Sequence, residues 1–191
     1  MAHTWVGICN LALTRCGAKQ ITSLSDIPNG VLCGSNYEIA VDEVIEDNDK
    51  GWSDTIERVE LTVDSTAPLS EKWAYRYLLP AAPYCLRVIE IEHEPAYVIE
   101  GRYILTNEPD PITIIYAKRI TDPTNISNRL AQAIGAHIAS MISYRLVQDR
   151  FLRQQIMQDA LRDILKAKGK DAMARSSASS DEKGGYTWAG R

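Results

Sequence analysis

The residues that act as nucleophiles, general bases or metal ligands are few in this chain and stand far apart. Histidine occurs only at His3, His93 and His137, so no two histidines have the i,i+4 spacing that places two ligands on one helix face. No pair of cysteines has the two-residue gap of a zinc knuckle; the four are Cys9, Cys16, Cys33 and Cys85. The sequence therefore predicts no metal, no cofactor and no enzymatic activity.

Other chemical sites are disfavoured by the order of the residues. The pair Gly184-Gly185 precedes no helix, as a phosphate-binding loop would require, and there is no nucleophile elbow. Acidic side chains gather between Glu38 and Asp49, but their spacing is not that of a calcium loop, and a charge run on a helix is usually its solvated face. A hydrolase that uses Cys33 or Cys85 is one alternative, although it needs a nearby histidine that the spacing does not supply.

Length, charge and hydropathy disfavour a DNA-binding, membrane or secreted protein. The chain has 191 residues, a formal net charge of −4 and a sequence pI of about 5.4. A sequence-independent DNA-binding protein would carry a basic stripe and a high pI. No stretch approaches the roughly 18 apolar residues of a membrane helix, and the N-terminus has no secretory signal. We therefore expect a protein made in a cytoplasm, with reduced cysteines and no membrane partner.

Apolar periodicity predicts two helices at each end of the chain. The first covers residues 5–16, with Thr4 as its N-cap. The second follows a turn at 28–30, with Asn29 or Ser35 as possible caps, and ends at Asp49-Lys50-Gly51. A third helix is predicted from Ser127 to about residue 147, and after a break at 148–149 a fourth runs to about residue 174. The apolar stripe predicted for the fourth helix consists of Leu152, Ile156, Ala160, Leu161, Ile164 and Leu165.

Between these helices the period changes to two, which is typical of strands. The predicted strands are 56–63, 73–79, 86–91, 97–99, 102–105 and 112–116, with a tight hairpin around Glu100-Gly101. We predict an α+β fold in which residues 1–50 and 124–175 form a four-helix bundle. An antiparallel β lobe is inserted at 51–123, and an extended, flexible C-terminal arm covers 176–191.

Charge is segregated among the predicted helices. The second helix is acidic, whereas the third and fourth are mainly basic. Opposite charges on separate faces serve either as two solvated surfaces or as the two halves of a head-to-tail contact, which generates a ring when the rotation closes. The candidate inter-subunit residues are Glu38, Asp42, Glu46, Arg145, Arg153, Arg162 and Lys166.

The end of the chain combines a spacer with residue types that are favoured at interfaces. A serine-rich segment, 176–180, leads to a tip that holds Tyr186, Trp188 and Arg191. A frayed terminus is the simpler interpretation, but this composition favours an arm that docks on a partner.

A series of short motifs runs along most of the chain. The series consists of Asn10-Leu11-Ala12-Leu13 with Gly17, Cys33 with Tyr37, Gly51-Trp52, Tyr75-Arg76-Tyr77-Leu78-Leu79-Pro80, Cys85-Leu86-Arg87-Val88, Tyr97-Val98-Ile99-Glu100-Gly101, Ile120-Thr121-Asp122-Pro123, and Thr187-Trp188 with Arg191. In this order and spacing the motifs resemble the phage tail tubular protein A family, the head-to-tail adaptors of short-tailed phages.

The resemblance implies a structural virion protein made in the host cytoplasm and built into the neck. It implies a ring of twelve copies that joins the portal to a downstream tail or nozzle protein and forms part of the DNA ejection channel, without specific DNA binding or catalysis. It also implies that the arm binds the portal through Tyr186, Thr187, Trp188 and Arg191.

The residues alone leave a second class of function open. The chain could be an intracellular protein-binding module that uses an exposed face of its β-sheet. In that interpretation the alternating aromatic residues Trp73, Tyr75 and Tyr77 would be exposed.

Overall fold

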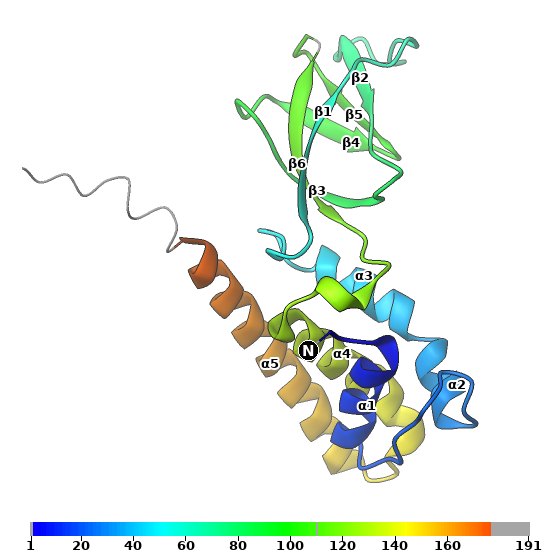
Figure 1. Cartoon of the computed structure of the whole chain (residues 1–191). Coiled ribbons are helices and arrows are strands. Elements are labelled where there is room, and N and C mark those ends of the chain that lie inside the picture. Colours follow the sequence, from blue (N-terminus) through cyan, green and yellow to red (C-terminus); the bar gives the residue numbers. More distant parts are fainter. Residues whose placement is uncertain (1, 110, 177–191) are drawn as a thin grey trace, which may run out of the picture. The chain divides into compact units, whose positions relative to one another are not determined.

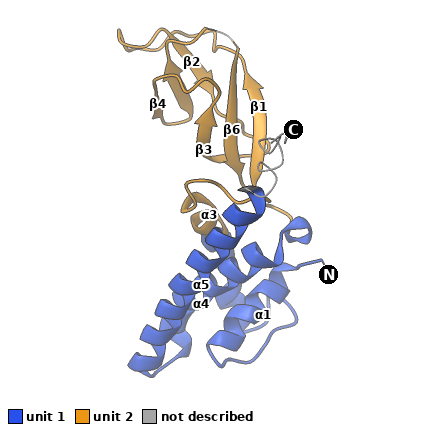
Figure 2. Cartoon of the chain, turned by 90° about the vertical axis from the view of Figure 1, so that its left-hand side faces the viewer, with its two compact units in different colours: residues 1–40, 123–191 blue, residues 41–122 orange. Residues whose placement is uncertain are grey.

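The structure, a computed structural model, describes residues 2–109 and 111–176. Contacts divide the chain into a helical unit, Met1–Ala40 with Pro123–Arg191, and a β unit, Val41–Asp122 (Figure 2). Helices and two antiparallel sheets are both present, which confirms the predicted α+β class. The portal-binding residues expected in the arm, which are Tyr186, Thr187, Trp188 and Arg191, lie outside the described residues.

The helical unit is built around the long helix α4. The helices of this unit are α1 (Trp5–Arg15), α2 (Asn29–Gly34), α4 (Asn128–Leu146) and α5 (Arg150–Ser176), with the 3-10 helix η1 (Pro123–Asn125) before α4 (Figure 1). Helix α4 packs against both α1 and α5. The glycine at Gly135 allows α1 to approach, because a Cβ there would lie 3.2 Å from the Cβ of Leu11.

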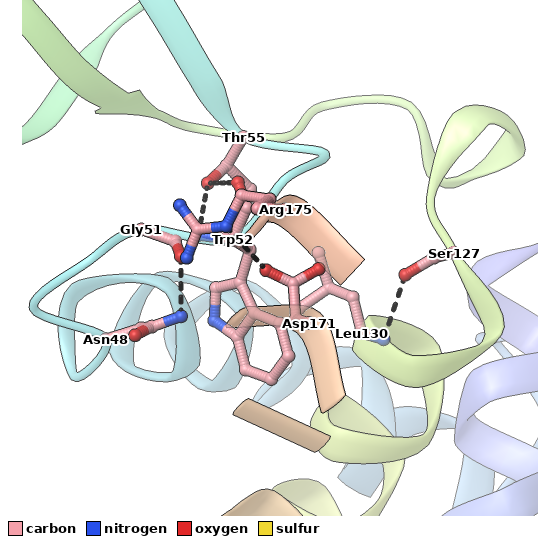
Figure 3. Close-up of polar contacts among 8 residues, drawn as sticks. All are labelled: Asn48, Gly51, Trp52, Thr55, Ser127, Leu130, Asp171 and Arg175. Carbon is pink, nitrogen blue, oxygen red and sulfur yellow. Dashed lines mark hydrogen bonds and ion pairs between the residues drawn. The ribbon is translucent and has the colours of Figure 1, made fainter. Parts of the chain in front are cut away.

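Local signals at the helix ends are the ones that the sequence predicts. The side chain of Thr4 accepts a hydrogen bond from Gly7 N at 3.0 Å and caps α1. The Ser127 hydroxyl accepts one from Leu130 N at 3.3 Å and caps α4 (Figure 3). Both predicted caps are therefore confirmed.

The prediction of a single second helix is wrong, because the structure has two helices, α2 and α3 (Tyr37–Glu46), in this segment. Helix α2 ends at Gly34, and α3 begins three residues later. The Ser35 hydroxyl donates to the carbonyl of Val31 at 2.7 Å, and the Asn36 amide donates to that of Leu32 at 2.7 Å. These side chains satisfy the last carbonyls of α2 and end the helix. The predicted turn at 28–30 is also corrected, since α2 already begins at Asn29.

The β unit contains two three-stranded antiparallel sheets. One has the order β1 (Ile56–Leu61), β6 (Ile112–Lys118), β3 (Cys85–Ile91), and the other has the order β2 (Tyr75–Leu78), β5 (Tyr103–Thr106), β4 (Tyr97–Glu100). The predicted hairpin at Gly101 is confirmed as β4–β5, and Gly101 has the positive φ of 60° that favours glycine. Buried residues from both sheets form one core: Leu61, Tyr77, Leu79, Cys85, Val88, Ile91, Ile104, Ile112, Ile114 and Tyr116.

The turn between α3 and β1 is organised by a buried tryptophan. Trp52 is fully buried, and its indole N–H donates to the carbonyl of Val44 at 2.9 Å. The Asn48 amide donates to the carbonyl of Gly51 at 2.7 Å, and the Thr55 hydroxyl donates to that of Trp52 at 3.0 Å (Figure 3). These bonds join the second half of α3 to the β unit. The unit boundary accordingly falls after Ala40, whereas the sequence placed it after residue 50.

Candidate interaction surfaces

The four cysteines are free thiols buried in the two units. Burial raises the pKa of Cys16 and of Cys85 to about 11 in each case. The hydrogen bond with Cys33, together with burial, holds the pKa of Cys9 far above its usual value. Within the described residues, no group of three His, Cys, Asp or Glu side chains could hold a metal ion. These positions therefore suit packing inside the fold.

We predict that none of these thiols reacts readily in the native protein at neutral pH. A thiolate is the reactive form, and burial opposes its formation at Cys16 and Cys85. The hydrogen bond with Cys9 lowers the pKa of Cys33, so the protection of Cys33 depends on its complete burial away from the reagent. A thiol-reactive dye should label the folded chain much more slowly than a low-molecular-weight thiol, and four groups per chain should react after denaturation. Rapid labelling of Cys33 or Cys85 in the folded protein would instead revive the hydrolase alternative.

The candidate inter-subunit acids occupy different environments. Asp42 receives two hydrogen bonds from the guanidinium of Arg119, one of them 3.0 Å long, so it is engaged within its own chain. The carboxylate of Glu38 accepts a hydrogen bond from the Tyr37 hydroxyl at 3.2 Å. Glu46 is exposed in the last turn of α3, which contains no basic residue of its own, and its backbone carbonyl accepts a hydrogen bond from Arg87 at 2.9 Å. The helix macrodipole disfavours a negative charge at the C-terminal end of a helix, so the carboxylate of Glu46 does not stabilise α3.

The candidate inter-subunit bases also differ in their contacts. Arg162 forms an ion pair of 2.7 Å with Asp159 on the same helix, and Arg153 lies over the ring of Tyr144. Arg145 is exposed near the end of α4, and Lys166 lines a groove. Within the helical unit, Arg153 and Lys166 therefore line two different hollows.

Beside its buried face, helix α5 carries a second row of apolar side chains, each more than half exposed. Its inner face buries Ile156, Ala160, Ile164 and Ala167 in the helical unit. Three apolar residues spaced four apart are exposed: Met157 (56%), Leu161 (61%) and Leu165 (58%). We call these three residues the outer ridge. Spacing of four residues places them along one line on a helix surface.

The outer ridge corrects the stripe predicted for the fourth helix. Leu152, Leu161 and Leu165 were expected to face the core, but all three are exposed. The sequence signal was present, because residues 157, 161 and 165 form their own i,i+4 series. The predicted stripe combined this exposed series with the buried series at 156, 160 and 164, so it did not distinguish the two.

A hollow lies at one end of the outer ridge, between α4 and α5. It measures about 320 Å³ and is lined by Ser140, Ser143, Tyr144, Arg150, Arg153, Gln154 and Met157. Tyr144 is largely exposed, and the stacked Arg153 guanidinium forms part of the rim. We call this site the α4–α5 hollow.

A separate basic groove of about 330 Å³ lies between the end of α1, the start of α4 and α5. Its lining residues are Arg15, Asn128, Arg129, Gln132, Asp163, Lys166, Ala167 and Lys170. Arg15 and Asp163 form an ion pair of 2.8 Å across it. The other three cations, Arg129, Lys166 and Lys170, make no ion pair with the part of the chain that the structure describes.

An isoleucine in the loop before α2 and a valine within α2 are both exposed. Ile27 is 87% exposed, and Val31 is 51% exposed one turn later. We call these two residues the Ile27 knob. Neither residue is among the interaction residues predicted from the sequence.

The aromatic face expected for a binding module is not exposed as a whole. Tyr77 is fully buried, and its hydroxyl donates to the carbonyl of Glu108 at 2.9 Å. Trp73 and Tyr75 are only partly exposed. Tyr77 lies on β2 and belongs to the core that this sheet shares with the sheet of β1, β6 and β3, and the order of the strands does not predict this packing. The alternative function therefore loses its central aromatic residue.

Charge is divided between the two units. The sequence of the helical unit carries thirteen Lys and Arg against eight Asp and Glu, a net charge of +5. The β unit carries eight against seventeen, a net charge of −9. The helical unit is therefore basic although the net charge of the whole chain is negative.

Comparison with protein-family models and with curated proteins finds no match to this chain. Within the described residues, no helix is both long enough and apolar enough to cross a membrane.

Proposed function

We propose that the chain is a structural virion protein, a subunit of the head-to-tail adaptor ring in a phage neck. The ring joins the portal to the next tail component and forms part of the channel through which DNA leaves. The observation that carries this proposal is the outer ridge of α5. The motif series supports the family, and the ridge supplies a surface through which copies associate.

The outer ridge is a physical argument for assembly. Each ridge residue follows a buried residue by one position, so the ridge lies about 100° around α5 from the buried row. In the single chain the buried row is covered, whereas the ridge is more than half exposed, and exposed apolar patches of this kind mark protein interaction sites. A ring needs such a surface on each copy together with a different surface that receives it.

The proposed subunit has three parts with separate tasks. A helical bundle made from both ends of the chain builds the body of the ring. The β unit faces the tail component. The arm, which follows the end of α5 at Ser176, reaches the portal through Tyr186, Thr187, Trp188 and Arg191. None of these tasks requires a catalytic residue.

The arm is tested by its removal. Deleting residues 177–191 keeps all of α5, so the circular dichroism spectrum of the helices should be unchanged. Co-sedimentation with the portal protein should be lost. A full-length chain with Tyr186→Ala and Trp188→Ala should show the same loss, whereas Ser179→Ala should not. Unchanged co-sedimentation of the deleted chain would remove the arm from the proposal.

A further inference from the structure

We propose that the Ile27 knob of one copy inserts into the α4–α5 hollow of the next copy. This inference rests on the proposed ring and names the surfaces that meet in it. Four observations carry it: a rigid knob, an apolar hollow, complementary charge at their rims and their separation on the helical unit.

The knob is held in place by its own loop. Asp26 Oδ2 accepts hydrogen bonds from the backbone N–H groups of Thr22 (2.6 Å) and Ser23 (2.9 Å) and from the Thr22 hydroxyl (3.0 Å). The carbonyl of Asp26 accepts one from Gly30 N at 2.6 Å. Gly30 sits so close to this loop that a Cβ there would lie 2.5 Å from the carbonyl oxygen of Ser23. A loop fixed in this way loses little conformational entropy when it binds.

The exposure of Ile27 is therefore a property of an ordered loop. A mobile loop could turn such a side chain toward its own core. Here the hydrogen bonds of Asp26 fix the residue beside it, and Ile27 stays almost wholly in solvent in the single chain. Covering such a side chain is favourable in proportion to the apolar area removed from water.

The hollow has the size and chemistry to receive a branched aliphatic side chain. Tyr144 and Met157 provide its apolar walls, and Gln154 together with the two serines provides polar atoms at its edge. The outer ridge continues from Met157 along α5, so Leu161 is available to Val31 when Ile27 enters the hollow.

The rims of the two surfaces carry opposite charges. Arg150 and Arg153 stand at the hollow, and Arg150 makes no ion pair with the described part of the chain. Asp26 stands beside Ile27, and only its Oδ2 atom is used by the loop. Hydrogen bonds from Ser23 and Thr22 hold the pKa of Asp26 below its usual value, so its carboxylate stays ionised at neutral pH. Its Oδ1 atom is available to an arginine of a second copy.

One copy cannot fill its own hollow. Helix α2 and helix α5 lie on opposite sides of the helical unit, with α1 and α4 between them (Figure 1). A knob on one side and a hollow on the other give a heterologous contact, in which each copy donates to one neighbour and accepts from the other. Repetition of this contact closes a ring when the rotation permits.

The test uses two variants that each break one side of the contact. Ile27→Glu removes the knob, and Met157→Glu puts a charge in the hollow; both positions are exposed in the single chain, so both variants should fold. Native mass spectrometry should show each variant alone as a monomer. An equimolar mixture should form a dimer of one copy of each, because one intact knob still meets one intact hollow. The matched control Ile39→Glu, at another exposed isoleucine, should assemble as the wild type does.

The outcomes separate this contact from the proposed ring. If Ile27→Glu assembles as the wild type does, or if the mixture stays monomeric, the knob does not enter the hollow, although the ring can still stand on another contact. If the wild-type chain itself never assembles, the proposed ring fails and this contact fails with it.

Discussion

Replacing Leu161 and Leu165 by glutamate should convert an assembling chain into a monomer that remains folded. Both side chains are more than half exposed in the single chain, so their replacement costs the fold little. In the assembly each leucine would be covered by a neighbour. Full burial of a leucine side chain contributes about 1.5–3 kcal/mol, and roughly 60% of each side chain remains to be covered, so the two contribute about 2–3.5 kcal/mol. The association constant should therefore fall by roughly 30- to 300-fold, since about 1.4 kcal/mol corresponds to a factor of ten.

Analytical ultracentrifugation over a wide range of concentrations measures this loss, and circular dichroism checks that the helices remain. The matched control changes two exposed polar positions, Gln148→Glu and Gln155→Glu, and adds the same negative charge away from the outer ridge. The control should assemble as the wild type does. Equal weakening in the two double variants would show that net charge, and not the ridge, governs the association.

The second large effect concerns stability and the turn around Trp52. Trp52→Ala should lower the free energy of unfolding by about 3–5 kcal/mol, because the substitution removes a fully buried aromatic side chain and leaves a cavity. It also removes the hydrogen bond to Val44, which leaves that carbonyl without its indole donor. The loss should appear in urea unfolding followed by circular dichroism.

Trp73→Ala is the matched control for this experiment. Trp73 is only partly buried, and Lys72 lies over its ring, so the control should cost clearly less than the Trp52 substitution. If Trp52→Ala shifts the unfolding free energy by no more than Trp73→Ala does, the indole does not organise the turn that joins α3 to the β unit.

Local signals made much of the secondary structure predictable. The caps at Thr4 and Ser127 mark the starts of α1 and α4, because a side-chain oxygen satisfies amide groups that the helix leaves free. The hairpin at Gly101 follows from a glycine that tolerates a positive φ. These features depend on residues close together in the sequence.

Features that depend on distant residues were not predictable in the same way. Strand β6 lies between β1 and β3, and this order brings Tyr77 of the other sheet into a shared core. Asp42 binds Arg119, which lies far along the chain. The acidic pattern of the predicted second helix indicated either a solvated face or a contact with another copy, and it did not indicate this partner within the chain. The Ile27 knob gave no periodic signal, because its exposure is set by the hydrogen bonds of its loop.

The central claim is that copies of this chain assemble head to tail into a closed ring. Electron microscopy of the concentrated wild-type protein, with native mass spectrometry of the same sample, tests it most directly. The account predicts rings of a single copy number with rotational symmetry, which are lost in the Leu161→Glu and Leu165→Glu double variant. A monomer at every concentration, or a two-fold dimer that the double variant leaves intact, would contradict it.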